Sequence, residues 1–228
     1  MRKSTIEKRT LQRNTVLKAA AKMFAERGFG GTSLGDVAKD LGISRPALYY
    51  YFSSKEEILS SLVDEVSVKS MKLIEDKRSQ DLAPVSKLHD MIHDQLLFVM
   101  RNKLSYMVVV KTEEELVAET RKLNLEAKKA VLDGFRGVIR EGIAQGHFRK
   151  IDPSVAALGI IGICSWCAWW FKDDGRLRDT EAAAQLTQMA LASIVDTGNN
   201  DAMRDEIGRL VTSLEDTVAS LTSLQKKY

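Results

Sequence analysis

The sequence has few of the residues that interrupt or cross-link a polypeptide chain. Its 228 residues include 3 prolines, 14 glycines and 2 cysteines, and 7% of them are aromatic. Apolar residues recur at helical spacing and no convincing alternating stretch is present, so a β-rich fold is excluded and an all-α protein is predicted. Two cysteines in one apolar segment offer no disulfide framework, which fits a reducing compartment.

The N-terminal sequence MRKSTIEKRTLQRN is basic and has no apolar stretch behind it. This pattern argues against a secretory signal, and the helical pattern that follows at once argues against a transit peptide. We therefore expect the protein to be cytoplasmic.

Catalytic and metal-binding patterns are weak throughout the chain. C-S-W-C at Cys164 and Cys167 lacks the further ligands of a zinc site and the strand that precedes a redox motif, so buried thiols are expected. His89 and His93 lie one helical turn apart, but a pair without a third ligand favours a solvated helix face. GFGGTSLG is similar to a phosphate-binding loop, but no strand precedes it and no lysine follows at the required position, so a nucleotide site is not expected. We expect no enzyme, no cofactor and no metal.

Positive charge is concentrated in the first quarter of the chain. Residues 1–55 carry 11 lysines or arginines against 4 acidic residues, whereas the remainder carries 23 against 27. A compact basic module before a mildly acidic body suggests a polyanion-binding head, because basic clusters neutralise phosphates and release counterions. A solvated basic face is the alternative.

Three short helices are predicted within this basic module. The segment TVLKAAAKMFAERG has an apolar face and ends at Gly28, and a second helix capped by Thr32 or Ser33 ends at Gly42. A third helix begins near Ser44, with a proline in its first turn, where the missing N–H is harmless. Two short helices joined by a glycine-containing turn form a helix-turn-helix.

The run of three tyrosines lies on the third predicted helix. A projection at about 100° per residue directs Leu48 and Phe52 into a small core, Tyr50 away from it and Tyr51 to the boundary. A phenolic hydroxyl can donate to phosphate oxygens while its ring lies against sugars or a thymine methyl, so we expect this outward face to contact DNA. The face is completed by Pro46, Ala47 and Tyr49.

The run TSLGDVAKDLGISRPALYYYFSSKEEIL, with AAAKMFAERGFGG before it, resembles the DNA-binding domain of the TetR family of transcriptional regulators over roughly residues 12–60. The resemblance implies DNA contacts by Thr32, Ser44, Arg45, Tyr49, Tyr50 and Lys55. The basic arm before the first helix is either a minor-groove contact or a solvated tail.

The rest of the chain continues in helical pattern. The stretch from Lys55 through EDKR contains no glycine or proline and would join the head to the body. The resemblance implies that this helix transmits ligand binding, that the bundle holds an effector pocket, and that the protein forms a homodimer through its last two core helices. Further helices are expected at about 84–102, 103–112, 114–145 with interruptions at Gly134 and Gly137, 153–172 and 179–197.

The predicted domains are a DNA-binding head at 1–55, an effector-binding and dimerisation body at 56–198 and a C-terminal extension at 199–228. The extension has apolar residues spaced by four and three, which predicts an extra helix packed on the body, with a short coiled coil as the alternative. The spaced residues are Ile207, Val211, Leu214, Val218 and Leu221.

The most apolar segment is SVAALGIIGICSWCAWWF, residues 154–171. Its length only just reaches that of a membrane span, and a helix apolar all round is also suited to burial or to a subunit interface, so we expect burial and no membrane. The segment resembles a Trp-containing stretch of TetR-type regulators that respond to acyl-CoA thioesters, in which asparagine commonly stands where this chain has Ser165.

This second resemblance implies an acyl-CoA effector, with a long acyl chain among aromatic side chains and phosphates at a basic mouth. The expected effector residues are Trp166, Trp169, Trp170, Arg136 and Arg140. Arg121, Lys122, Lys128 and Lys129 are further candidates for the mouth.

The sequence as a whole thus predicts a dimeric DNA-binding regulator, a repressor that binds a palindromic double-stranded operator and is released by a small hydrophobic effector. A regulator that responds to a drug or aromatic compound, a ligand-independent architectural DNA-binding protein and a carrier of hydrophobic ligands are the alternatives.

Overall fold

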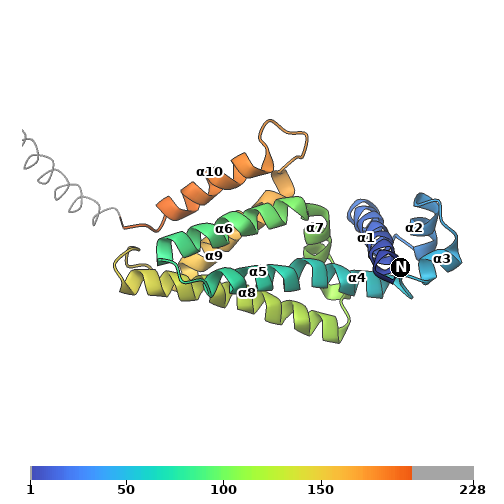
Figure 1. The fold of residues 1–228 in the computed structure, drawn as a ribbon, viewed down its shortest axis with the longest axis horizontal. Helices are drawn as coiled ribbons and strands as arrows, with labels where there is room; N and C mark the ends of the chain where they lie inside the picture. The colour runs from blue at the N-terminus through green and yellow to red at the C-terminus, as the bar shows by residue number, and fades with distance from the viewer. Residues whose placement is uncertain (1, 197–228) are drawn as a thin grey trace, which may run out of the picture.

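The computed structural model describes residues 2–196, which form an elongated all-helical molecule with a small head and a longer body (Figure 1). Within these residues the only β pairing is an isolated antiparallel bridge between Phe148 and Val195. The predicted all-α class is therefore confirmed. The helices are α1 (Arg2–Arg27), α2 (Leu34–Asp40), α3 (Arg45–Tyr49), α4 (Lys55–Val63), α5 (Lys69–Arg78), α6 (Pro84–Arg101), α7 (Lys103–Lys111), α8 (Ala118–Ala144), α9 (Pro153–Trp170) and α10 (Asp179–Ala192).

The short helices of the head begin at serine caps. Ser33, Ser44 and Ser54 each accept a hydrogen bond from a backbone N–H one turn into α2, α3 and α4, respectively. Gly28 and Gly42 follow α1 and α2 with φ values of +77° and +63°, a conformation that glycine adopts without strain. These local signals place the helix-turn-helix where the sequence predicts it.

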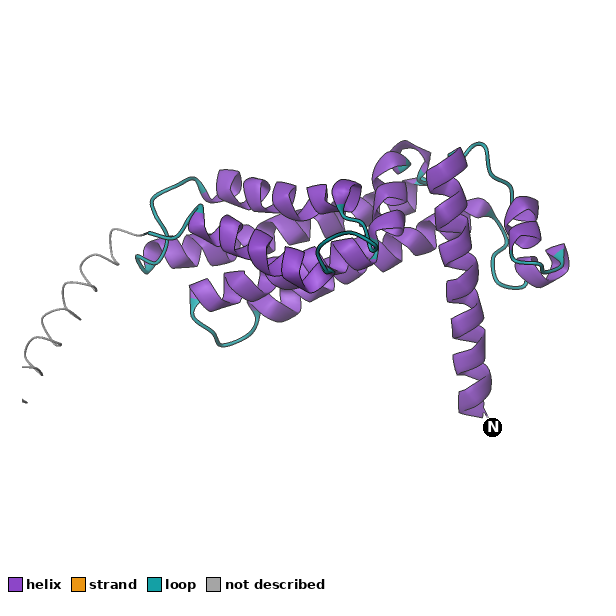
Figure 2. Ribbon diagram, turned by 90° about the horizontal axis from the view of Figure 1, so that it is seen from above, coloured by secondary structure: helices purple, strands orange, loops and turns teal. Residues whose placement is uncertain are grey.

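Helix α1 is longer than predicted. It begins at Arg2, so the basic N-terminal residues continue the helix and extend beyond the rest of the head (Figure 2). The expected arm is thus helical, because Lys, Arg, Glu and Gln are good helix formers and the segment has no proline or glycine to stop it.

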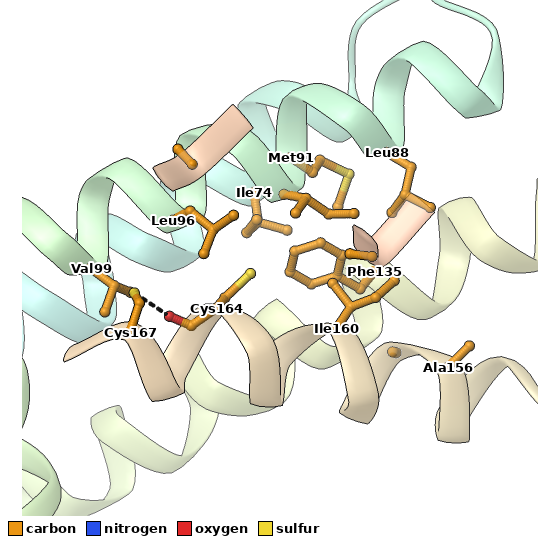
Figure 3. Close-up of a cluster of buried hydrophobic side chains, with 14 of the residues drawn as sticks. Ile74, Leu88, Met91, Leu96, Val99, Phe135, Ala156, Ile160, Cys164 and Cys167 are labelled. Carbon is orange, nitrogen blue, oxygen red and sulfur yellow. Dashed lines mark hydrogen bonds between the residues drawn. The ribbon is translucent and has the colours of Figure 1, made fainter. Parts of the chain in front are cut away.

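The body is a bundle in which α10 packs on α6, while α5 and α9 pack on both α6 and α8 (Figure 1). Phe135 of α8 is fully buried beside Met91 of α6 and Ile160 of α9 (Figure 3). Helix α8 runs without interruption through Gly134, against which the side chain of Ile74 packs so closely that a Cβ would lie 2.5 Å from it. The expected break at Gly134 is therefore wrong, because the glycine serves helix packing.

The two cysteines lie in this core. Cys164 and Cys167 are free and buried, and the thiol of Cys167 donates to the Cys164 carbonyl oxygen (Figure 3). Burial raises the pKa of Cys164 well above its ordinary value and raises the pKa of Cys167 to about 12. The prediction of buried thiols is confirmed.

Helix α9 has two different faces. It is long and apolar enough to span a membrane by length and composition alone, and 33% of it is buried within the chain. The expected burial thus holds for one face, whereas Val155, Trp166 and Trp170 are exposed on another.

The head and the body share part of their packing. Val108 and Val109 of α7, and Leu116 just after it, are buried in the same cluster as the apolar residues of α1 to α4. Between α4 and α5 lies a π-helical turn, Asp64–Val68, so the chain is helical without a break from Lys55 to Arg78. The C-terminal extension expected at 199–228 lies outside the described residues.

Candidate functional site

The outer face of α3 is exposed as the helical projection predicts. Leu48 and Phe52 are fully buried, whereas Tyr49 is 54% exposed and Tyr50 is 62% exposed. Tyr51 lies at the boundary, and its hydroxyl donates to the side chain of Gln12 on α1. The remaining residues of the exposed face are Ser44, Arg45, Pro46 and Ala47.

Arg45 is positioned by a glycine on the neighbouring helix. A Cβ added to Gly35 of α2 would lie 2.9 Å from Nη2 and 3.1 Å from Nε of Arg45, so the guanidinium lies directly over the α2 backbone. Arg45 forms no hydrogen bond or ion pair among residues 12–196, so its five N–H donors are available. Nothing in the sequence pattern singled out Gly35.

Thr32 and Lys55, for which the resemblance implies DNA contacts, each donate a hydrogen bond within the head. Thr32 is 3% exposed and its hydroxyl donates to the carbonyl oxygen of Gly28 at 3.0 Å. Lys55 Nζ donates to the carbonyl oxygen of Phe29 at 3.0 Å and lies 4.4 Å above the centre of the Phe29 ring. The Thr32 hydroxyl is thus directed away from the surface. The Lys55 ammonium uses one of its three N–H donors in this bond, so two can still bind another group.

These elements surround a hollow of about 480 Å³ on the head. Its wall consists of residues 30–36, Arg45, Tyr49 and Lys55. Arg45 and Lys55, together with Tyr49 at the end of α3, outweigh the charge of Asp36 and give a concave surface suited to an anionic backbone.

A second cavity lies in the body, beside the head. It has a volume of about 380 Å³ and is lined by the π-helical turn and by α5, α6, α7, α8 and α9. Its lining is largely apolar, as is usual for small-molecule sites. The lining residues are Val66, Ser67, Ser70, Gln95, Tyr106, Val109, Val110, Ala127, Lys128, Lys129, Val131, Leu132, Leu158, Ile161 and Ser165.

The cavity wall contains two hydrogen-bonded polar pairs. The Ser70 hydroxyl donates to Gln95 Oε1 at 2.9 Å, and the Tyr106 hydroxyl donates to Ser165 Oγ at 2.8 Å. Burial raises the pKa of Tyr106, so its hydroxyl stays a neutral donor. The buried part of the wall therefore offers hydrogen bonds without formal charge.

A polar chain connects the π-helical turn with the rim of the cavity. The Ser67 hydroxyl donates to Asn124 Oδ1 at 2.6 Å, and the Asn124 amide donates to Glu113 at 3.4 Å. Glu113 in turn accepts from Lys128 Nζ at 2.6 Å. Lys128 and its neighbour Lys129 are both exposed, so the cationic end of the cavity faces solvent.

The five expected effector residues lie outside the lining of this cavity. Trp166 is 63% exposed, and its ring stacks on that of Trp169 at a distance of 6.0 Å. Trp169 lies about 40° around α9 from Ser165, and its ring packs edge-on against Tyr106 of the cavity wall at 6.1 Å. Trp170 is also exposed. On α8, Arg136 and Arg140 lie about 12 Å and about 18 Å beyond Lys128, as the rise per residue requires. Of the further cations, Lys128 and Lys129 line the cavity, and Arg121 and Lys122 do not.

The histidine pair forms no metal site. His89 and His93 stack at a ring distance of 6.0 Å, and each lies beside the aspartate that follows it. No group of three potential metal ligands occurs among the residues that the structure describes.

Comparisons with known proteins agree with this geometry. Residues 16–62 match the family described as "Bacterial regulatory proteins, tetR family", and residues 81–194 match "Tetracyclin repressor-like, C-terminal domain". The HTH-type transcriptional repressor KstR2 of Mycolicibacterium smegmatis is 26% identical over 199 residues, which cover 82% of this chain and 92% of that protein.

Solved structures have the same architecture. The TetR family regulator PfmR of Thermus thermophilus superposes with a TM-score of 0.70 at 28% identity, covering 78% of this chain and 97% of PfmR. AibR, solved in complex with isovaleryl coenzyme A and operator DNA, superposes with a TM-score of 0.66 at 26% identity, covering 78% of this chain and 96% of AibR. The chain therefore belongs to the TetR family of DNA-binding transcriptional regulators.

Proposed function

We propose that this protein is a homodimeric repressor that binds a near-palindromic operator through α3 and is released when an acyl-CoA thioester occupies the cavity of the body. The observation that carries the proposal is the position of this cavity. Val66 and Val109 line it and are also buried in the core cluster of the head.

The exposed face of α3 supports the DNA contact. Arg45 begins α3 and Tyr50 directly follows it, and the helix is capped by Ser44 and anchored by buried Leu48, so a rigid element positions both residues. In a dimer, two such helices would enter successive major grooves about 34–36 Å apart. Tyr50→Ala is expected to weaken operator binding and alter base preference, with only a small change in melting temperature, because the ring is 62% exposed and packs edge-on against Tyr51.

The outer side of α9 supports the homodimer. Val155, Trp166 and Trp170, together with Met189 of α10, expose apolar surface on the two helices that come last in the body. Exposed tryptophan and methionine on adjacent helices are typical of subunit interfaces.

The lining of the body cavity supports a thioester ligand. An apolar interior accepts an acyl group, and Lys128 and Lys129 at the rim supply cations for phosphates. Similarity to AibR, which was crystallised with isovaleryl coenzyme A, points to the same ligand class. At about 30 Å³ per water-sized group, the 380 Å³ would hold about a dozen such groups, which favours a short or medium acyl chain over a long one.

Two contacts would connect ligand binding to the head. A ligand that displaces Val66 or Val109 moves residues that pack on α1 and α4. A phosphate that pairs with Lys128 competes with Glu113, which holds Asn124 and, through it, Ser67 of the π-helical turn. The coupling is set by the differential affinity of the ligand for the operator-bound and free conformations.

The test is operator release, measured by fluorescence anisotropy on an operator selected from random duplexes. The probes are acyl-CoA thioesters of several chain lengths, free CoA, free fatty acids and flat aromatic drugs. Thioesters should release the operator, and Lys128→Gln should weaken their effect, whereas Lys122→Gln on the same helix should not.

Three other results would contradict the proposal. Release by an aromatic drug and by no thioester would indicate a drug-responsive regulator. Binding that no probe alters would favour an architectural DNA-binding protein. An asymmetric half-site bound by a monomer would contradict the dimer.

A further inference from the structure

Gln95 lines the body cavity, and its side-chain amide has unused donors. Gln95 lies on α6 and is 6% exposed. Its Oε1 accepts from the Ser70 hydroxyl at 2.9 Å, which orients the amide. Its Nε2 donates to no other side chain or backbone group among residues 12–196, although an amide nitrogen has two protons to donate.

The surroundings of Gln95 are mainly apolar. Val66, Val109 and Ile161 line the same cavity, and both of its cations lie at the exposed end. A plain alkyl chain in contact with the amide would remove water from Nε2 and return no acceptor, which is unfavourable. A ligand oxygen at this position would instead complete the hydrogen bonding of the wall.

We infer that Gln95 is the specificity-determining residue of the effector site, and that Nε2 donates to a carbonyl oxygen of the ligand. Ser70 is its positioning residue, because the hydroxyl holds Oε1 and so turns Nε2 toward the cavity. The inference rests on the proposed acyl-CoA function and adds a requirement to it. The ligand must place a carbonyl, either of the thioester or of the acyl chain, inside the cavity.

A neutral donor suits a carbonyl better than a carboxylate. No lysine, arginine or histidine lies among the cavity residues of α5, α6, α7 or α9, and Lys128 and Lys129 of α8 are already paired with Glu113 and Asp133. A buried carboxylate without a cation is costly, whereas a ketone or thioester oxygen needs only one donor. Sites that hydrogen-bond a ligand group discriminate strongly against analogues that lack it.

The experiment compares three CoA probes of equal chain length with the purified full-length protein: hexanoyl-CoA, its thioether analogue hexyl-CoA, and 5-oxohexanoyl-CoA. Binding is measured by calorimetry for the wild type, Gln95→Met and Ser70→Ala. Gln145→Met, at the exposed end of α8, is the matched control. Melting temperatures report whether each variant folds.

The wild type should bind a carbonyl-containing probe at least about 10-fold more tightly than the probe that lacks that carbonyl. Gln95→Met should reduce this ratio to within about 2-fold, Ser70→Ala should reduce it partly, and Gln145→Met should leave it unchanged. Preference for hexanoyl-CoA over hexyl-CoA would assign the thioester carbonyl, and preference for 5-oxohexanoyl-CoA over hexanoyl-CoA would assign a carbonyl of the chain.

Two outcomes would overturn the inference, and they are distinguishable. If all three probes bind the wild type equally, or if Gln95→Met keeps the ratio, the role of Gln95 is wrong while the acyl-CoA proposal stands. If none of the probes binds, the proposed effector class is wrong and the role of Gln95 fails with it. If the Gln95→Met protein does not fold, the inference is tested by the affinity ratio of the wild type and by its reduction in Ser70→Ala.

Discussion

The contact between Gly35 and Arg45 predicts a substitution that affects stability and DNA binding in opposite directions. Gly35 is the second residue of α2, and a methyl group there would approach the Arg45 guanidinium to 2.9 Å. Ordinary contact requires about 3.5 Å or more, so Gly35→Ala must displace the guanidinium by about half an ångström or more. Because the displaced group is the end of a flexible side chain, the fold can accommodate the change.

The two effects have different sizes. Alanine in place of a helical glycine stabilises a protein by about 0.4–1 kcal/mol where the backbone allows it. An arginine that contacts a guanine edge contributes about 1–3 kcal/mol, and displacement removes part of this contribution. We therefore expect Gly35→Ala to raise the free energy of unfolding slightly and to weaken operator binding about 3- to 30-fold.

The assay pairs operator titration with urea unfolding for Gly35→Ala, Arg45→Ala and the double variant. If the loss acts through the guanidinium, the double variant should bind no more weakly than Arg45→Ala. Gly137→Ala on α8, where a Cβ meets nothing within 4 Å, is the control that should leave DNA binding unchanged. Wild-type affinity of Gly35→Ala, or an equal loss in the Arg45→Ala background, would refute the reasoning.

Four further predictions concern other parts of the molecule. Lys55→Ala should weaken binding to all sequences and flatten the dependence of affinity on salt by a slope of about 1; a base-specific loss would contradict a phosphate contact. Cys164 and Cys167 should resist iodoacetamide at pH 8 until guanidinium is added, because burial raises the pKa of both thiols; early labelling, detected by mass spectrometry, would contradict this. Phe135→Ala should lower the free energy of unfolding by about 3–5 kcal/mol, measured in urea, and a loss below about 1 kcal/mol would contradict full burial. Deletion of 199–228 should leave DNA specificity intact and lower dimer stability, and unchanged sedimentation and melting would make the extension a solvated appendage.

Local signals in the sequence predicted the head well. Ser44 predicted the start of α3, Gly28 and Gly42 predicted the ends of α1 and α2, and the helical projection predicted that Tyr50 is exposed while Leu48 is buried. Each of these features depends on residues within one or two turns, because caps and helical periodicity are short-range effects.

Neither the local signals nor the resemblance indicated how Gly134, Thr32 and Trp166 pack against other parts of the chain. Gly134 was expected to interrupt a helix and instead lets Ile74 approach α8. The resemblance implied a DNA contact by Thr32, whose hydroxyl donates to the Gly28 carbonyl oxygen. It also implied an effector contact by Trp166, which is 63% exposed on α9. Both contacts stay predictions.

The sequence by itself determined the all-helical class, the helix-turn-helix and the exposed face of α3. Only the tertiary structure decided where the cavity of the body lies, because it is formed by residues as far apart in the chain as Val66, Gln95 and Ser165. The tertiary structure also places Val109 both in the cavity lining and in the core cluster of the head. Periodicity specifies which face of a helix is apolar, but the partner that covers this face, and the gaps left between partners, follow from how distant segments pack.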